Sequence, residues 1–481
     1  MAVLSNDLIR LGASGASTGY TIKNSCRFND DDSPGLTKTF GTATDAKKWT
    51  ISAWVKLIGK TDGASGAIRL MDAGASNGNE DLISIGSAYS GYEKIYFWKR
   101  TSSSYNFRLE TNTLFRDPAA WYHVVFNYDS DNTIETERAR IYVNGVREIN
   151  LAQNSYPSSG HSSRINTNIA HGVGKSVNTS GTVYYSDGYL AEYYFLDGYS
   201  YGPEYFGEFD ENGIWIPKEY TGSYGNNGFR FEFKNSGSLG ADTSGNGNNF
   251  ASTGLASNDQ KKDTPTNNMI TFNPLNNQRN GGTPSNGNLD YVGPGTRTLI
   301  SLTANIPSTG KWAIAFKVAQ VSTNAGWQFG VMKSNDSDFG DAAGSNEDVG
   351  HPDGINMSPS SSDLQLYDSA NSTSIDPSLP ITTSDEFWIA VDMATGKVFL
   401  GIYDESATSM KFVAADTGLD GNPATGDNPT ATISDMIGSD EYVFAVGSKQ
   451  TSQHIYLQRS TDVSGTTPTG YTYFENVKDL L

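Results

Sequence analysis

Two short motifs in the sequence match loops that carry catalytic or phosphate-binding groups in other proteins. Residues 15–19, GASTG, fit the G-x-S-x-G pattern, in which Ser17 would be a nucleophile. That motif needs a strand before the serine and a helix after it, but a Gly/Ser-rich stretch precedes Ser17 and the strand-like TIK follows. Residues 171–176, HGVGKS, match the end of a P-loop, but Ile169 stands where its first glycine is required. Both segments are therefore interpreted as loops or turns.

Three acidic residues, Glu208, Asp210 and Glu211, lie close enough in the chain to suggest a carboxylate pair. Glycoside hydrolysis uses two carboxylates that face one cleft. Asp210 and Glu211 are adjacent, so on a strand they would point to opposite faces. Asn212-Gly213 then favours a turn. We interpret the segment as a solvated acidic loop, assign no catalytic residue and expect the chain not to be an enzyme.

Residues 242–248, DTSGNGN, place Asp242, Ser244 and Asn246 at alternate positions before a glycine. This spacing brings oxygen ligands together in calcium loops. The bidentate glutamate expected at the twelfth position is replaced by Thr253. The segment is thus a candidate calcium site, and the favoured alternative is an Asx-rich turn.

A group of aromatic residues falls in a loop-rich stretch: Tyr89, Tyr92, Trp98 and Tyr105. Exposed tyrosine and tryptophan rings can stack on sugar faces, because each has an apolar face and a polar edge. These four are the candidate ligand-binding residues. The alternative for each one singly is packing in the core.

Composition limits the partners and the compartment. Lys and Arg total 34 against 53 Asp and Glu, a net charge of −19. The resulting field repels phosphate backbones, so nucleic acid is not an expected partner. The single cysteine, Cys26, allows neither an internal disulfide nor a zinc cluster. No apolar run reaches the ~18 residues of a membrane span, and no signal peptide is recognisable, so we expect synthesis in a cytoplasm and no membrane insertion.

The elements that would position such residues are strands. Period-two alternation marks residues 49–58, 121–129, 139–145 and 189–198, and then 312–321, 327–332, 387–393, 397–403, 442–448 and 454–460. Asn144-Gly145 and Thr395-Gly396 are predicted hairpin turns. Many short strands separated by turn-forming residues predict an all-β protein of two antiparallel β-sandwiches joined by a Gly/Asn/Pro-rich segment.

The expected division has four parts. Residues 1–45 form an N-terminal segment that could anchor the chain, and 46–200 form the first sandwich. Residues 201–294 are an aromatic packing segment followed by a linker, and 295–481 form the second sandwich.

Both blocks resemble known families. The first resembles a laminin-G-like, concanavalin A-like sandwich, through WTISAWVKL (49–57), AWYHVVFNYD (120–129), ARIYVNGV (139–146) and GYLAEYYFLDG (188–198). This resemblance implies a second candidate calcium group at Asp30, Asp31 and Asp32, with a charged surface loop as the alternative. The second block resembles a SPRY sandwich, through TGKWAIAFKV (309–318), FWIAVDMATGKVFLGI (387–402) and GNPATGDNPT (421–430).

The joined arrangement resembles structural proteins of marine tailed phages, through PEYFGEFD, DTSGNGNNF and PTGYTYFENV in this order. This resemblance implies a virion location, as a tail fibre or a capsid fibre or decoration, with other virion proteins as partners and a homotrimeric assembly. The expected function is recognition of a host-surface glycan or protein through the sandwich loops. The alternatives are a purely structural virion spacer and, less favoured, a polysaccharide depolymerase.

Overall fold

In the computed structural model, the chain divides into two compact units, Arg10–Asn268 and Met269–Leu481, which we call the first and second sandwich. The structure describes residues 19–58, 67–76, 78–86, 94–177, 183–278, 282–294, 298–319, 327–334, 355–360, 363–368, 371–374, 381–416, 418–448 and 451–477. All sheet pairings in the described part are antiparallel except one. The predicted fold, two antiparallel β-sandwiches, is confirmed.

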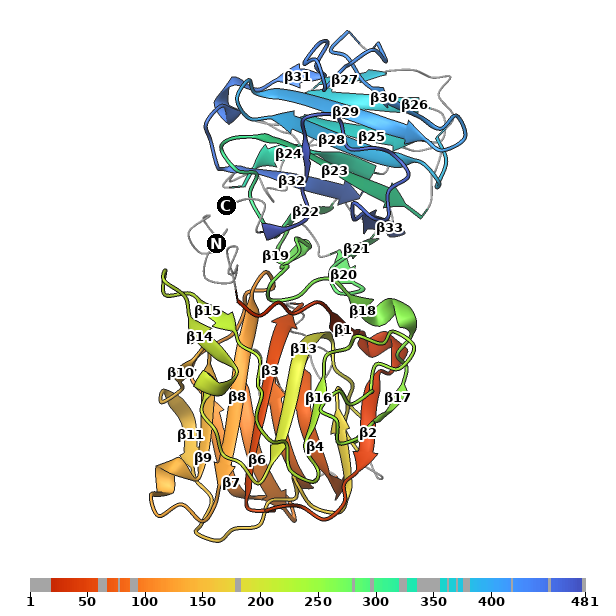
Figure 1. Ribbon diagram of the computed structural model, residues 1–481. Helices are drawn as coiled ribbons and strands as arrows, with labels where there is room; N and C mark the ends of the chain where they lie inside the picture. The colour runs from red at the N-terminus through yellow and green to blue at the C-terminus, as the bar shows by residue number, and fades with distance from the viewer. Residues whose placement is uncertain are drawn as a thin grey trace. The chain divides into compact units, whose positions relative to one another are not determined.

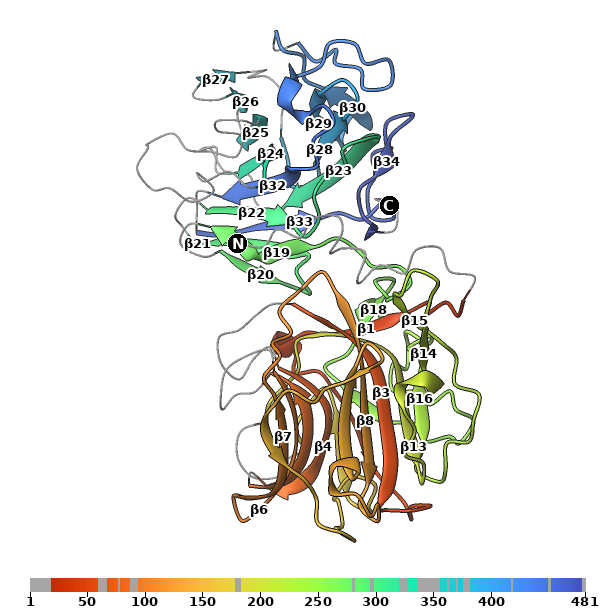
Figure 2. The same cartoon turned by 90° about the vertical axis from the view of Figure 1, so that its left-hand side faces the viewer.

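The first sandwich consists of two eight-stranded sheets (Figure 1). The β3 sheet contains β10 (Val146–Arg147), β9 (Ala139–Val143), β8 (Trp121–Asp129), β3 (Lys48–Leu57), β13 (Gly188–Asp197), β1 (Ser25–Phe28) and β18 (Gln260–Lys261), with β16 (Phe229–Phe231) also paired to β13. The β6 sheet contains β11 (Leu151–Ser155), β7 (Ser104–Thr111), β6 (Ile95–Thr101), β5 (Asn79–Ile85), β4 (Ile68–Ser76), β12 (Ala170–Val173), β2 (Gly35–Thr39) and β17 (Ala251–Thr253). Figure 2 shows the two sheets face to face, with β14 (Gly207–Phe209) and β15 (Trp215–Pro217) outside the β3 sheet.

Strand β3 is buried on both faces, which explains its nearly continuous apolar character. Ile51 and Val55 point into the core between the sheets. Trp54 and Ile58 lie in a separate cluster with Ile22, on the outer face. An outer face of a sheet is usually wet in antiparallel sandwiches; here residues 19–24 and 199–268 cover part of it.

The second sandwich pairs a seven-stranded sheet with a nine-stranded one. The first contains β19 (Phe272–Gln278), β22 (Thr298–Leu302), β32 (Tyr442–Ser448), β24 (Trp327–Lys333), β25 (Ile355–Ser360), β26 (Asp363–Asp368) and β27 (Asn371–Ser374). The second contains β20 (Thr283–Ser285), β21 (Asp290–Pro294), β33 (Thr451–Leu457), β23 (Lys311–Val318), β28 (Glu386–Asp392), β29 (Lys397–Asp404), β30 (Ser409–Phe412), β31 (Ala431–Thr432) and β34 (Thr472–Tyr473). In its core Phe329 stacks on Phe387, and Phe316 packs against Phe329 at a tilt.

Helical structure in the described residues is limited to five single-turn 3-10 helices. These are η1 (Asp30–Asp32), η2 (Glu135–Glu137), η3 (Pro203–Tyr205), η4 (Ser257–Asp259) and η5 (Ser434–Met436). A search of the same residues for a helix that is long and apolar enough to cross a bilayer found none.

Both predicted hairpin turns are confirmed. Asn144 and Gly145 have φ values of 47° and 81° between β9 and β10, as a type I′ turn requires. Gly396 has φ 68° between β28 and β29.

Two expected boundaries need correction. The first sandwich does not begin at residue 46, because β1 pairs with β13 and β2 pairs with β12, so both belong to its sheets. Residues 201–268, expected to be an aromatic packing segment and the start of a linker, belong to the first sandwich. Strands β16, β17 and β18 extend the sheets, and buried ion pairs join Arg27 to Asp259 and Lys56 to Asp263. The alternation in FRFEFKN (229–235) predicts a strand where β16 lies, but sequence periodicity missed β17 and β18 because they are only three and two residues long.

Candidate functional site

The segment from residue 199 to residue 228 forms an extra layer on the outer face of the β3 sheet, and Trp215 fixes it there. The Trp215 indole donates a hydrogen bond from Nε1 to Nδ1 of His123 on β8, at 3.0 Å, and stacks on that imidazole. Any side chain at Gly145 or Gly207 would run into the indole ring. Burial lowers the pKa of His123 to about 3, so the ring is neutral and accepts at Nδ1 while Nε2 faces Ser52 Oγ.

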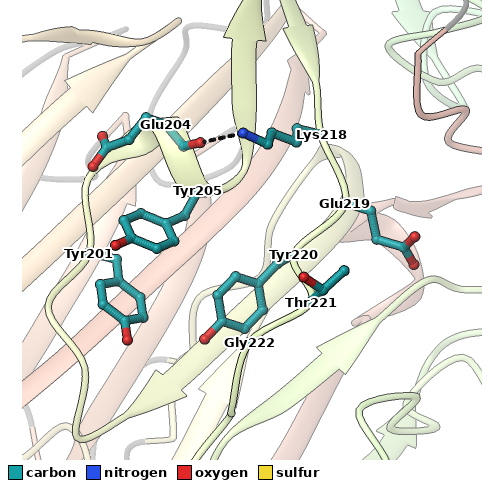
Figure 3. A pocket seen from close by; sticks show the side chains of 8 residues that line it. All are labelled: Tyr201, Glu204, Tyr205, Lys218, Glu219, Tyr220, Thr221 and Gly222. Atoms are coloured by element: carbon teal, nitrogen blue, oxygen red, sulfur yellow. Dashed lines mark hydrogen bonds between the residues drawn. The ribbon is translucent and has the colours of Figure 1, made fainter.

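Beside this anchor lies a hollow of about 450 Å³, which we call the tyrosine hollow. Its lining residues are Tyr201, Glu204, Tyr205, Lys218, Glu219, Tyr220, Thr221 and Gly222 (Figure 3). They come from η3, from the loop before it and from the loop that follows β15. The volume lies within the range of small-ligand sites in proteins.

Stacked tyrosines form one wall of the hollow. The rings of Tyr201 and Tyr205 lie 4.1 Å apart between centroids, at 14° to one another, and Tyr205 is 43% exposed. Tyr220 is buried and donates its hydroxyl to the carbonyl of Ser223, which orients its ring. Within the described part of the chain, the hydroxyls of Tyr201 and Tyr205 make no hydrogen bond. They therefore remain available to a ligand beside an exposed aromatic face.

Charged groups stand at the rim. Lys218 Nζ donates to the backbone carbonyl of Glu204 at 3.3 Å. The Glu219 carboxylate accepts from Nη1 of Arg230 at 3.2 Å. In Figure 3 the carboxylates of Glu204 and Glu219 point away from each other. The hollow thus presents polar groups around an aromatic wall, and its two carboxylates do not converge on one point as a glycosidase pair would.

A buried charge network supports the back of the hollow. Arg230 Nε donates to Glu192 Oε1 at 2.6 Å, and the Tyr194 hydroxyl donates to the same carboxylate. Burial raises the pKa of Glu192 above its ordinary value, although the positive charge of Arg230 acts in the opposite direction. Glu192 has φ 47° at a bulge in β13, a strained conformation for a non-glycine residue. Arg230 therefore links the sheet interior to Glu219 at the rim.

Two of the four predicted aromatic residues, Trp98 and Tyr105, lie in the described part of the chain. Tyr89 and Tyr92 lie outside the described residues. Trp98 lies in strand β6, not in a loop, and is 1% exposed, so its ring is not accessible for stacking on an external sugar. Tyr105, in β7, is 42% exposed and packs against Trp98 and the guanidinium of Arg108.

The predicted calcium loop is an Asx-rich turn, which was the alternative interpretation of its sequence. The Asp242 carboxylate accepts hydrogen bonds from the backbone amides of Arg230, Ser244 and Asn248 and from the Ser244 hydroxyl, at 2.7–3.0 Å. Asn246 turns its amide nitrogen toward the carbonyls of Gly225 and Gly228. The side-chain oxygens of Asp242 and Ser244 therefore accept hydrogen bonds from within the protein, Ser244 Oγ from the amide of Asn246.

Other acidic candidates are likewise placed in turns. Asp30, Asp31 and Asp32 form η1, where Asp32 accepts from Asn29. Asp210 caps a turn by accepting from the amides of Asn212 and Ile214. Among the described residues, no group of three or more His, Cys, Asp or Glu side chains could hold a metal ion. Ser17 lies outside the described residues.

Sequence reasoning missed Tyr201, Tyr205 and Glu219, because residues 200–228 have no strand periodicity and their composition indicates only packing. The density of tyrosine in GYSYGPEYFGEF was the available signal. A second, smaller hollow of about 330 Å³ lies in the second sandwich, lined by Ala414, Ala415, Asp416, Asn428, Pro429, Ala431 and Thr432. It has no aromatic wall, so the tyrosine hollow is the better candidate.

Comparison with known proteins agrees with this architecture. Residues 30–198 match the Laminin_G_3 family, described as the concanavalin A-like lectin/glucanases superfamily. No curated protein matches the sequence.

Three solved structures are among those that match this chain. The LG4-5 domains of the mouse laminin α1 chain match 96% of this chain and 90% of their own, at 9% identity and TM-score 0.30. The TRIM65 PSpry domain matches 40% of this chain and 92% of its own, at 12% identity and TM-score 0.28. The SPRY domain of human HERC1 matches 39% of this chain and 96% of its own, at 13% identity and TM-score 0.26.

Proposed function

We propose that this chain is a binding protein of a tailed-phage virion surface, and that it recognises a host-surface glycan in the tyrosine hollow of its laminin-G-like sandwich. The observation that carries the proposal is the exposed Tyr201–Tyr205 stack lining a hollow of about 450 Å³. Aromatic faces bind the apolar faces of sugars, and surrounding polar groups fix their hydroxyls. The superfamily matched by residues 30–198 takes its name from lectins, which bind carbohydrate, and glucanases, which hydrolyse it.

Binding is favoured over hydrolysis by the direction of the two carboxylates at the hollow. Glu204 and Glu219 point apart, and Glu219 pairs with Arg230. A depolymerase would need one protonated and one ionised carboxyl on either side of a glycosidic bond. The virion assignment rests on the phage-like sequence segments, and the homotrimer remains part of the same proposal.

The test is binding of the labelled full chain to a glycan array and to host cells, with and without a calcium chelator. We expect saturable binding to a restricted set of glycans and competition by the free glycan. The chelator should not change glycan binding, because donors within the protein already occupy the Asp242 carboxylate in its Asx-rich turn. Absence of binding to cells and to every glycan would contradict the proposal and favour the structural spacer. Release of shortened saccharides would instead favour the depolymerase.

A further inference from the structure

A lysine, an aspartate and an asparagine meet on the outer face of the β3 sheet, where later segments of the chain bury them. Lys56 Nζ lies 2.8 Å from Oδ2 of Asp263 and 2.8 Å from Oδ1 of Asn268. The three residues are 1%, 3% and 4% exposed. An amine, a carboxyl and a carboxamide are thus in mutual contact where bulk water does not reach.

Neighbouring groups hold the two acceptors in place. The Trp121 indole donates from Nε1 to Asp263 Oδ1 at 2.9 Å, which leaves Oδ2 facing the amine. Asn268 Nδ2 donates to the carbonyl of Ala119 at 2.7 Å, which turns its Oδ1 toward Lys56. The carbonyl carbon lies one C=O bond behind that oxygen, so Nζ is no more than about 4 Å from it. That separation is close to a near-attack geometry.

An apolar cluster lies beside the amine and the carboxyl. Trp54, Ile58, Trp121 and Tyr189 form an apolar cluster on this face of the sheet. A buried ion pair loses much of its hydration, so transfer of the proton from the ammonium to the carboxylate costs less than in water. A neutral lysine amine is a nucleophile.

We propose that Lys56 and Asn268 become joined by an intramolecular amide bond, formed by the protein itself with Asp263 as the acid–base residue. Asp263 takes a proton from the Lys56 ammonium, and the neutral Nζ attacks Cγ of Asn268 while Asp263 protonates the amide oxygen. Asp263 then moves a proton from Nζ to the departing NH2 group. The Cγ–Nδ2 bond breaks, the Nζ–Cγ bond remains, and one ammonia leaves. The product no longer carries the ammonium charge of Lys56 and ammonia leaves as a neutral molecule, so the remaining proton stays on Asp263.

The bond would join the middle of the sheet to the last residue of the first sandwich. Lys56 is on β3, between β8 and β13, and the chain passes into the second sandwich directly after Asn268. A covalent link here would keep residues 257–268 on the sandwich even when the non-covalent contacts of η4 and β18 open. It would supply a cross-link to a chain that has a single cysteine.

The decisive measurement is the mass of the native full chain after denaturation. We expect a value below the sequence mass by one ammonia, about 17 Da. Trypsin should not cleave after the modified Lys56, so digestion should yield a branched peptide of residues 49–60 and 263–279. Fragment ions should place the branch on Asn268. A folded chain of full sequence mass with linear peptides would overturn the proposal, and so would a branch on Asn267 or Asp263.

Variants separate the roles of the three residues. Asn268→Ala and Asp263→Ala should both retain the full sequence mass, and Asn268→Ala should unfold at a lower temperature than the native chain. Asp259→Asn is the matched control, because it breaks a second buried ion pair in the same segment, that with Arg27. It should keep the branched peptide. A branched peptide that persists in folded Asp263→Ala would contradict the acid–base role of Asp263, and the native mass decides the matter even where a variant fails to fold.

Discussion

At the scale of single residues, whether a side chain can bind a ligand depends on its burial and on the hydrogen bonds that it already makes within the protein. Asp242 looks like a metal ligand in the sequence, yet four donors from its own loop and from β16 occupy its carboxylate. Trp98 looks like a sugar platform, yet it is buried. Sequence supplies the residue types, but only the fold shows which polar atoms and ring faces remain available.

The Asp242 turn gives the first prediction. Asp242→Ala should lower the free energy of unfolding by about 1–3 kcal/mol, because three backbone amides and a hydroxyl lose their acceptor. Urea denaturation followed by tryptophan fluorescence measures the change. Addition of calcium or of a chelator to the native chain should leave the unfolding midpoint unchanged. A calcium-dependent midpoint that disappears in Asp242→Ala would show that the loop binds the ion after all.

Buried histidines make the free energy of unfolding depend on pH. Burial lowers the pKa of His123 to about 3 and that of His171 to about 4, both below the ordinary value of 6.5. The unfolded chain therefore binds more protons than the folded chain between these values, and stability falls as pH drops from 6.5 toward 4. Burial raises the pKa of Asp72 to about 6, which acts in the opposite direction.

His123→Gln should make the stability less dependent on pH in this window, by at most about 1.36 kcal/mol per pH unit for one proton. Chemical denaturation at pH 4.5, 5.5 and 6.5 measures the slope. Asp72→Asn is the opposing variant and should make the slope steeper. An unchanged slope in His123→Gln would mean that this imidazole is protonated in the folded state.

At the scale of elements, the strands that could be predicted from the sequence are those with a regular hydrophobic pattern. Strands β3, β8, β9 and β13 alternate or run apolar over five or more residues, and the β9–β10 turn carries Asn-Gly, so their places in the sheet could be inferred. The layer from residue 199 to residue 268 has strands of two or three residues and long-range side-chain contacts. No local pattern encodes such contacts, and the candidate site lies in this layer.

Trp215 tests how that layer is held. Trp215→Ala removes the indole that contacts His123, Gly145 and Gly207, and should lower the free energy of unfolding by about 2–4 kcal/mol. It should also release the β14–β15 hairpin and weaken ligand binding in the hollow. Phe209→Ala is the control, since Phe209 touches the same indole but is 53% exposed. Equal losses of unfolding free energy in Trp215→Ala and Phe209→Ala would mean that the indole does not anchor this layer to the β3 sheet.

At the scale of the whole molecule, the first sandwich extends well beyond the residues that match a family. That match ends at residue 198, whereas Asp259 and Asp263 neutralise the buried Arg27 and Lys56. A fragment of residues 19–198 would lose both carboxylates and would uncover the apolar cluster around Trp54 and Trp121, which costs several kcal/mol of buried apolar surface. A fragment of residues 19–268 keeps both ion pairs.

We therefore expect the 19–268 fragment to unfold cooperatively and the 19–198 fragment not to fold. Circular dichroism with thermal unfolding distinguishes the two outcomes. A cooperative transition in the shorter fragment would mean that residues 199–268 are not required for the first sandwich to fold.

The central claim is that the tyrosine hollow binds a glycan, and a pair of matched variants tests it most directly. Tyr205 and Tyr105 are 43% and 42% exposed, but only Tyr205 lines the hollow. Binding of each full-length variant to host-surface polysaccharide should be measured by calorimetry. We predict that Tyr205→Ala weakens binding about tenfold or more, a loss of about 1.4 kcal/mol, and that Tyr105→Ala binds like the native chain. Native affinity in Tyr205→Ala, or a loss confined to Tyr105→Ala, would contradict the claim.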